Sequence, residues 1–285
     1  MINNYKQIIE LRSITGSGIL DCKQILNKVN GNMEKALLLL RQKGITKATK
    51  KINRKTCNGV ICYDINHNKA SIIKLTCETD FVAKNHIFIK LANQIASLLC
   101  KYENNSIHKF LDYKTKSNVT ISNLIKQHIS ILGENISLKE IGFLSTSKGV
   151  IIPYVHNKFN DKTGTIIVLV VLEGEISDKV ANFGKFLAMH IADSKPLVLS
   201  IEKLDNNLIS KEKNMLTLQL KQLEQSKDIV EKTLKEKMKN FFSEIVLMEQ
   251  PFIINKKKTI KSVIQELNRD CNFSLKEYIY LEIKK

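Results

Sequence analysis

Apolar side chains recur at helical spacing in three short runs within the first 44 residues. Residues 15–18 include Gly16 and Gly18, and glycine adopts backbone angles that a helix does not use. Asn30-Gly31 is typical of a helix C-terminus, and the next residue, an asparagine, can cap the helix that follows. We therefore predict three helices in a small apolar bundle that is complete at about residue 44, where a glycine ends the last helix. Their apolar faces comprise Tyr5, Ile8, Ile9, Leu11, Ile19, Ile25, Leu26, Val29, Met33, Ala36, Leu37 and Leu40.

The middle of the chain alternates between extended and helical patterns. Residues 60–65 and 70–76 are rich in β-branched and apolar side chains, and the turn residues between them predict a β-hairpin. Two helices follow, and Gly133 ends the second helix before an extended segment at 136–144. His128 lies on the apolar side of that helix, where we favour a hydrogen-bonded core histidine over a ligand. The two helix faces comprise Phe88, Leu91, Ile95 and Leu98, then Ile121, Leu124, Ile125, His128 and Leu132.

The second half of the chain repeats this order of hairpin and helix. The sequence identity between the halves is slight, and we interpret the repetition as a weak internal duplication. Further along, the chain returns through residues 250–254 to a last helix and strand. The predicted elements are strands at 149–156 and 165–172, a loop at 157–164, a helix at 178–192 ended by Pro196, a helix at 260–267 and a strand near 279–283.

Residues 205–241 have a different pattern, in which apolar side chains follow heptad-like spacings. A polar stretch at 224–228 separates the two halves, and charged residues of both signs cover the outside. This pattern predicts a helical hairpin packed as a short antiparallel coiled coil, which can pair with a second copy or stay free. The apolar positions are Ile209, Leu216, Leu220, Leu223, Val230, Leu234, Met238 and Phe241.

The composition is that of a globular protein with a strong positive charge. The chain has 285 residues, of which 43% are hydrophobic and 26% charged, and its net charge is +17 at pH 7. Such a charge favours nucleic acid, anionic membrane or acidic protein partners. The alternative is a chain that is rich in Lys, Asn and Ile throughout. The lysines are spread from end to end with few arginines or aromatic residues between them, so we favour this alternative over a dedicated nucleic-acid surface.

Residues 41–63 contain basic side chains and no acid. The composition of this segment is that of a connector exposed to solvent. The alternative is a basic strip that faces an acidic surface of a partner. The basic residues are Arg41, Lys43, Lys47, Lys50, Lys51, Arg54 and Lys55.

Several kinds of chemistry find no support in the sequence. The six cysteines form no Cys-x-x-Cys pair and no histidines cluster beside them, so we expect reduced thiols and no zinc site. We find no phosphate-binding loop, no dinucleotide-binding glycine motif and no nucleophile elbow. No signal peptide or long apolar run occurs, so we expect a soluble cytoplasmic chain. These absences favour a binding protein over an enzyme.

Asp80-Phe81 stands at the junction between the predicted hairpin and the next helix. In a local interpretation, Thr79 or Asp80 caps that helix while Phe81 packs into the core. In a functional interpretation, Phe81 enters an apolar pocket of a partner and Asp80 supplies a directed charge. Spacing alone slightly favours the local interpretation.

Five motifs, in order along nearly the whole chain, resemble those of the translation elongation factor Ts family. One of them alone would be a weak signal, whereas five in the family's order are a strong one. Ser13, Ile14, Leu132 and residues 137–139 depart from the family's usual residues. The motifs are Leu11-Arg12-x-x-Thr15-Gly16-x-Gly18-x-x-Asp21-Cys22-Lys23, Thr79-Asp80-Phe81-Val82-Ala83-Lys84, Gly133-Glu134-Asn135-Ile136, Met189-His190-Ile191-Ala192 with Ser194-Lys195-Pro196, and Gln250-Pro251-Phe252.

The resemblance implies a non-catalytic guanine-nucleotide exchange factor that binds elongation factor Tu in its GDP-bound and nucleotide-free states. It implies no cofactor, no metal, no membrane and no required nucleic acid. Asp80 and Phe81 are implied to enter the partner near its magnesium and phosphate site. The resemblance therefore favours the functional interpretation of Phe81 over the local one. Thr79 can still cap the helix. The implied contact residues are Arg12, Lys23, Thr79, Asp80, Phe81, Val82, Leu132, Gly133, His156, Ile253 and Ile254.

The resemblance also implies an α+β fold. Its parts are a ubiquitin-associated-like module of three N-terminal helices, two related α/β core subdomains with antiparallel sheets, and a protruding antiparallel coiled-coil hairpin. We expect the module and basic linker at 1–55 and the core subdomains at 56–144 and 145–285, with the hairpin inserted at about 205–241.

Overall fold

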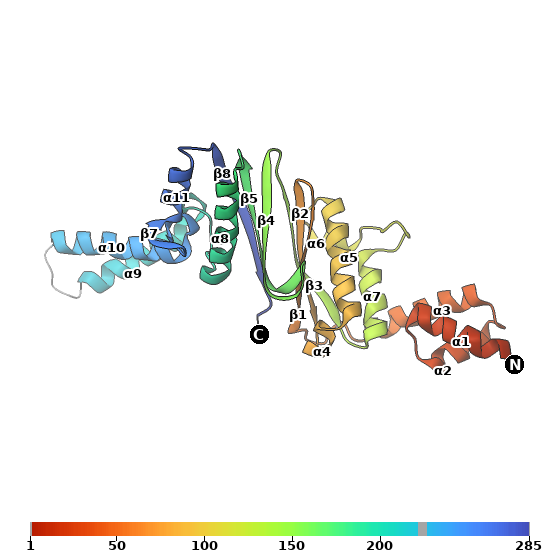
Figure 1. Cartoon of the computed structure of the whole chain (residues 1–285). Coiled ribbons are helices and arrows are strands. Elements are labelled where there is room, and N and C mark those ends of the chain that lie inside the picture. The colour runs from red at the N-terminus through yellow and green to blue at the C-terminus, as the bar shows by residue number, and fades with distance from the viewer. Residues whose placement is uncertain (1, 222–226, 285) are drawn as a thin grey trace. The chain divides into compact units, whose positions relative to one another are not determined.

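The computed structural model describes residues 2–221 and 227–284, and Figure 1 labels its helices and strands. The chain divides into two compact units. The first holds the residues up to Leu144, Val155–Ile167 and the residues from Leu281 on, and the second holds Ser145–Tyr154 and Val168–Tyr280. Helices and antiparallel strands are mixed in the chain, which confirms the predicted α+β class.

The first unit begins with the three predicted helices and continues into a mixed core. Strands β4 and β5 contribute residues to both units. The elements of the first unit, in chain order, are α1 (Ile2–Thr15), α2 (Ile19–Lys28), α3 (Met33–Thr49), β1 (Asn58–Asn66), β2 (Lys69–Cys77), α4 (Asp80–Ala83), α5 (His86–Tyr102), α6 (Ile107–Leu111), α7 (Ile121–Leu132) and β3 (Ile136–Ser145), followed by parts of β4 (Gly149–Asn160) and β5 (Thr163–Gly174).

The N-terminal helices α1, α2 and α3 enclose a small apolar cluster of their own. Asn32 caps α3 as predicted, because its side chain accepts a hydrogen bond from the backbone N–H of Lys35 at 3.0 Å. The buried face is narrower than the predicted one. Tyr5, Ile9 and Ile19 are exposed, whereas the buried residues are Ile8, Leu11, Cys22, Ile25, Leu26, Ala36 and Leu40.

Gly44 does not end the third helix, contrary to the prediction. It lies inside α3 and is buried against Ser130 of α7, where an added Cβ would come within 2.9 Å of the Ser130 Oγ. Glycine therefore serves a close approach of two helices here, and not a helix end. The predicted connector at 41–63 is correspondingly too long. Residues 41–49 are helical and β1 begins at Asn58, so the connector comprises residues 50–57.

The core of the first unit is built on the predicted hairpin. β1 pairs with β2 in an antiparallel register that runs from Asn58↔Cys77 to Asn66↔Lys69, and the strand order of this unit is β3-β2-β1-β5. α5 lies along this hairpin (Figure 1) and buries Phe88 among the residues of its apolar face. In α7, His128 Nδ1 lies 2.9 Å from the Leu124 carbonyl oxygen, as expected for a hydrogen-bonded histidine.

The second unit contains the remaining strands and helices. β5 pairs with β4 and with β8, and α8 covers β4 and β5 so closely that an added Cβ at Gly184 would meet Ile152 and Leu172. The elements are parts of β4 and β5, then α8 (Asp178–Ser194), η1 (Ile201–Lys203), α9 (Asn206–Lys221), α10 (Lys227–Ile245), η2 (Leu247–Glu249), β6 (Pro251–Phe252), β7 (Asn255–Thr259), α11 (Ile260–Leu267) and β8 (Phe273–Glu282).

Two predictions differ from the structure in this half of the chain. The predicted loop at 157–164 is mostly strand, because β4 continues to Asn160 and β5 begins at Thr163, where it pairs with β1. β8 begins at Phe273 and not near residue 279. α9 and α10 pack against each other in the segment where the helical hairpin is expected, and Leu223 and residues 224–226 lie outside the described residues.

Candidate functional site: the corner at Phe81

The chain turns sharply after β2 into the short helix α4, and this turn presents Phe81 to solvent. Thr79 is the N-cap of α4, and its Oγ1 accepts a hydrogen bond from the Val82 N–H at 3.4 Å. Ala83 is buried and Val82 half-buried, whereas Phe81 is 82% exposed. The local interpretation is therefore right about the cap at Thr79 and wrong about Phe81, which does not pack into the core. We call residues 78–82 the Phe81 corner.

The Asp80 carboxylate lies beside Phe81 on the exposed side of α4. Its Oδ2 accepts a hydrogen bond from the Lys84 Nζ at 3.1 Å, one helical turn away. Both side chains are more than half exposed. A pair of this kind contributes little stability and breaks easily, so the Asp80 charge remains available to a partner.

The Glu134 carboxylate fixes the backbone of the Phe81 corner by accepting three hydrogen bonds. Its Oε2 accepts hydrogen bonds from the backbone N–H groups of Glu78 at 3.1 Å and Thr79 at 3.0 Å, and its Oε1 accepts one from the Thr79 hydroxyl at 2.6 Å. Hydrogen bonds to a carboxylate are shorter and stronger than those between neutral groups. The backbone that carries Phe81 is thus fixed by three such bonds from a residue 55 positions away.

Glu78 returns the contact. Its Oε1 accepts a hydrogen bond from the Asn135 backbone N–H at 2.6 Å, and its carbonyl oxygen accepts one from the Asn58 Nδ2 at 2.8 Å. The second and third motifs therefore meet as a reciprocal pair of segments. The sequence did not single out Glu78, Glu134 or Asn135 as site residues, although the last two belong to a recognised motif and Glu78 directly precedes one.

Cys77 precedes the corner and offers no reactive thiol. Its Sγ donates a hydrogen bond to the Thr79 carbonyl oxygen at 3.1 Å. Burial, followed by the negative charges of Glu134, Asp80 and Glu78, raises the pKa of this thiol to about 12. A thiol with such a pKa is protonated at neutral pH and is a poor nucleophile.

The other predicted site residues lie on several elements. Gly133 adopts a left-handed φ of 78° at the C-cap of α7, adjacent to Glu134, so the structure brings it next to the Phe81 corner. Leu132 is half-buried against the core. The remaining residues are exposed and lie elsewhere: Arg12 on α1, Lys23 on α2, His156 on β4 and, in the second unit, Ile253 and Ile254 between β6 and β7.

In the second unit, the fourth and fifth motifs are joined by hydrogen bonds. Gln250 Oε1 accepts a hydrogen bond from Ser194 Oγ at 2.9 Å and lies 2.9 Å from His190 Nε2, while Gln250 Nε2 donates to the Glu244 carbonyl oxygen at 2.8 Å. This assigns the ring proton of neutral His190 to Nε2. Burial lowers the pKa of His190, so the ring is neutral at neutral pH. Phe252 is buried beside this ring, which leaves Ile253 and Ile254 to face solvent.

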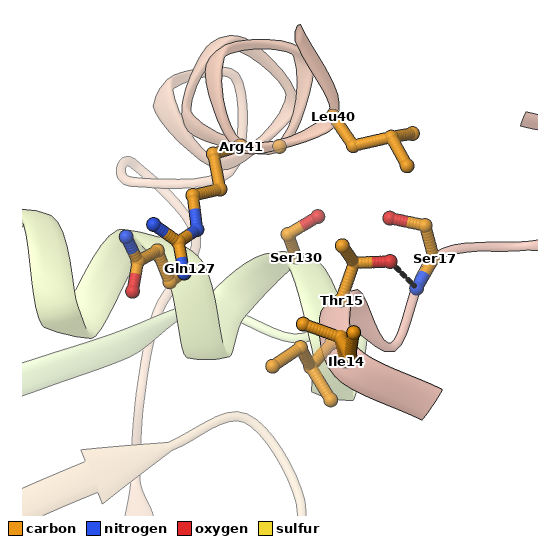
Figure 2. Close-up of a pocket in the computed structure, with 9 residues that line it drawn as sticks. Ile14, Thr15, Ser17, Leu40, Arg41, Gln127 and Ser130 are labelled. Atoms are coloured by element: carbon orange, nitrogen blue, oxygen red, sulfur yellow. Dashed lines mark hydrogen bonds between the residues drawn. The ribbon is translucent and has the colours of Figure 1, made fainter. Parts of the chain in front are cut away.

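A small cavity of about 80 Å³ lies where the N-terminal helices contact α7. Figure 2 shows Arg41 and Gln127 at one end of the cavity and Thr15 and Ser17 at the other, with Ser17 N–H bonded to Thr15 Oγ1 at 3.3 Å. Sites for small molecules usually have several hundred Å³. The cavity is therefore a gap in helix packing and has no room for a nucleotide.

Two other kinds of site were sought among the described residues. Within residues 2–221 and 227–284 no group of His, Cys, Asp and Glu is arranged to hold a metal ion. None of the helices in that same part of the chain is both long and apolar enough to cross a membrane. The Phe81 corner, an exposed aromatic ring on a fixed backbone, remains the strongest candidate for function.

Comparison with known proteins agrees with the motifs. The family model described as "Elongation factor TS" matches residues 78–285. Over 269 residues the chain is 39% identical to "Elongation factor Ts" of Ehrlichia ruminantium (strain Gardel), an alignment that covers 94% of this chain and 93% of the relative. It is 33% identical to "Elongation factor Ts" of Mesorhizobium japonicum over 96% of this chain and 90% of that relative. It is 34% identical to "Elongation factor Ts" of Bartonella henselae, over 92% of this chain and 86% of that relative.

Proposed function

Because the chain belongs to the elongation factor Ts family of translation elongation factors, we propose that it is a guanine-nucleotide exchange factor for elongation factor Tu. In this proposal Phe81 and Asp80 disturb the magnesium and phosphate site of the partner and promote GDP release. The observation that carries the proposal is the 82% exposure of Phe81 on a corner whose backbone is held by Glu134. The alternative of a basic nucleic-acid-binding protein finds no support in the family.

The mechanism follows from thermodynamic linkage. A factor that binds nucleotide-free Tu more tightly than Tu·GDP must weaken GDP binding by the same coupling free energy. The magnesium ion and the β-phosphate provide the strongest electrostatic contacts of a bound nucleotide. An aromatic ring and a carboxylate that enter next to them displace groups that hold GDP, without covalent chemistry in the factor itself.

The fixed backbone of the corner suits such a role. An exposed aromatic residue commonly dominates the free energy of an interface, provided that it is held in its bound geometry. The three hydrogen bonds from Glu134 order residues 78 and 79 before any partner binds. Little ordering then remains to be done when Phe81 enters the partner.

The proposal extends to other surfaces of the chain. We propose that α1, α2 and α3 form a ubiquitin-associated-like module at 1–55 that contacts the nucleotide-binding domain of Tu through Arg12 and Lys23. Two related core subdomains follow at 56–144 and 145–285. α9 and α10 are proposed to form an antiparallel coiled-coil hairpin, which stays free or pairs with a second copy. The further proposed contacts are Thr79, Val82, Leu132, Gly133, His156, Ile253 and Ile254.

The test is the release of a fluorescent GDP analogue from elongation factor Tu of the same organism, followed after excess GDP is added. We expect the wild-type chain to accelerate release. Phe81→Ala should lower the maximum release rate about 30-fold, as for an interface residue worth about 2 kcal/mol. Leu218→Ala removes a comparably exposed apolar side chain on α9 and should change the rate less than about twofold. No acceleration by the wild-type chain would refute the proposal.

A further inference from the structure

Asn135 joins two parts of the first unit that are far apart in the sequence. Its side chain is almost fully buried, with 3% exposed. The carboxamide Nδ2 donates hydrogen bonds to the carbonyl oxygens of Ile52 at 2.9 Å and Arg54 at 2.7 Å, both in the connector. The backbone N–H of the same residue donates to Glu78 in the Phe81 corner at 2.6 Å. One residue thus binds the connector with its side chain and the corner with its backbone.

Two further contacts hold the connector near Asn135. The Arg54 Nη1 lies 3.6 Å from the Glu78 Oε2, so the connector also contacts the corner directly. The Lys51 Nζ donates a hydrogen bond to the carbonyl oxygen of Gly133, at the C-terminal end of α7. A cation at this position is also favoured by the helix dipole. The connector, which leads from the N-terminal helices to β1, is therefore held at three points, namely by Glu78 of the corner, by Asn135 and by Gly133.

From these contacts we propose that Asn135 is a positioning residue, which fixes the connector to the Phe81 corner so that the N-terminal helices and Phe81 meet the partner together. The inference rests on the proposed function, since it concerns how two surfaces of one exchange factor engage one partner. Two contact surfaces that are already joined lose less freedom on binding than two surfaces linked by a loose segment. Fixing the connector therefore increases affinity for the partner and leaves the action of Phe81 unchanged.

The geometry separates the two tasks of this motif. Glu134 holds residues 78 and 79, whereas the Nδ2 of Asn135 donates its two hydrogen bonds to the connector. Asn135→Asp keeps the size of the side chain and the backbone N–H, but it places a carboxylate against two carbonyl oxygens. It should release the connector while Glu134 still holds the corner.

The first measurement needs no partner. Arg54 is in the connector, and an arginine-specific protease cuts after it only when the connector leaves its place. We expect Asn135→Asp to accelerate this cleavage about 10-fold or more, in line with the loss of two buried hydrogen bonds. Lys51→Met removes another tether without burying a charge, and it should accelerate the cleavage as well. Lys51→Met is used in place of Asn135→Asp if circular dichroism shows that Asn135→Asp does not fold.

Asn105→Asp is the control for the same chemical change away from the connector. Asn105 also bridges a backbone, since its Nδ2 donates to the Phe143 carbonyl oxygen at 3.3 Å and its Oδ1 accepts from the Phe143 N–H at 2.5 Å. Its contacts lie outside the connector. This variant should leave the cleavage after Arg54 at the wild-type rate.

The second measurement is GDP release from elongation factor Tu over a range of factor concentrations. Asn135→Asp should raise the half-saturating concentration about 10-fold and change the maximum rate less than about twofold. Phe81→Ala should instead lower the maximum rate. In the Asn135→Asp background, Arg12→Ala should cost less affinity than in the wild type, because the N-terminal helices then contribute less to binding. A residue that merely stabilises the fold would not produce this coupling.

The outcomes separate this inference from the proposed function. An unchanged cleavage rate in both Asn135→Asp and Lys51→Met would overturn the inference that Asn135 fixes the connector to the corner. Faster cleavage with an unchanged half-saturating concentration would overturn its part in exchange, while the proposed function stands. A wild-type chain that releases no GDP would overturn the proposed function and the role of the joint in exchange, and the cleavage rates alone would then decide whether Asn135 holds the connector.

Discussion

Glu134 binds Thr79 at both of its hydrogen-bond donors, the backbone N–H at 3.0 Å and the hydroxyl at 2.6 Å. The same hydroxyl accepts the hydrogen bond that caps α4. The orientation of the helix that carries Phe81 is thus set by a carboxylate that lies just after α7. The exposed ring and its buried support belong to different segments, and substitutions can address them separately.

Glu134→Ala should destabilise the protein by about 2–3 kcal/mol, because three donors of the corner lose a charged acceptor and two of them are backbone groups. Urea unfolding measures this change. Glu140→Ala is the control, since Glu140 is about half exposed and pairs with Lys74 on the surface, and it should cost less than about 0.5 kcal/mol. Equal costs for the two variants would contradict the role of Glu134.

The mobility of the corner can be read directly, because the chain has no tryptophan. In a Phe81→Trp variant the single indole reports on residue 81 alone. We expect Glu134→Ala to lower the fluorescence anisotropy of Trp at this position, since the backbone beneath it loses its hydrogen bonds. An unchanged anisotropy would mean that the cap at Thr79 suffices to hold the corner.

Truncation of Phe88 should destabilise the protein strongly, whereas truncation of Phe81 should hardly change its stability. Phe88→Ala removes a fully buried ring of the first unit and should cost about 3–5 kcal/mol of unfolding free energy. Phe81→Ala removes a ring that is 82% exposed and should change it by less than about 0.5 kcal/mol. Urea unfolding of both variants tests the pair. A large loss of stability in Phe81→Ala would contradict the exposure of Phe81 and indicate that its ring packs into the core.

Acid should weaken the fold through its buried histidines. Burial lowers the folded-state pKa of His190, so the unfolded chain takes up the proton first, near its ordinary pKa of about 6.5. The stability that neutral His190 contributes is fully present above that pH and is lost as the pH falls toward the lowered folded-state pKa. Burial lowers the pKa of His128 in the same direction.

The urea concentration at the unfolding midpoint should therefore decrease when the pH is lowered from 7.5 to 5.5. This decrease should be smaller in His190→Gln than in the wild type. The residual fall in that variant includes the contribution of His128 in the first unit. A wild-type midpoint that rises on acidification would contradict the direction of both pKa shifts.

The thiols should differ in reactivity. Cys57 is the exposed one of the six free cysteines, whereas Cys62 and Cys77 are buried with their pKa raised to about 12. A thiol reagent at pH 8 should modify Cys57 first, and Cys57→Ser should abolish this fast phase. Cys62 and Cys77 should react only after unfolding in urea. Fast modification of either in the folded protein would contradict their burial.

The elements that depend on local pattern could be predicted from the sequence. The period of apolar residues located α5 and α7, the β-branched runs located the hairpin of β1 and β2, and Asn32 and Thr79 act as the predicted caps. These features depend on residues a few positions apart, which interact in any fold that contains the element. The order of five short motifs was sufficient to identify the family.

Only the tertiary structure decided what each of those residues faces. Spacing alone slightly favoured a core position for Phe81, which the fold instead exposes to solvent. Spacing also assigned Gly44 to a helix end, whereas the glycine lies inside a helix and allows Ser130 of another helix to approach closely. The roles of Glu134 and Asn135 depend on partners more than fifty positions away. Such contacts form only when the chain closes on itself, so no local pattern records them. The sequence by itself determined the elements and the family, and the closed fold determined which side chains support the corner and which one it exposes.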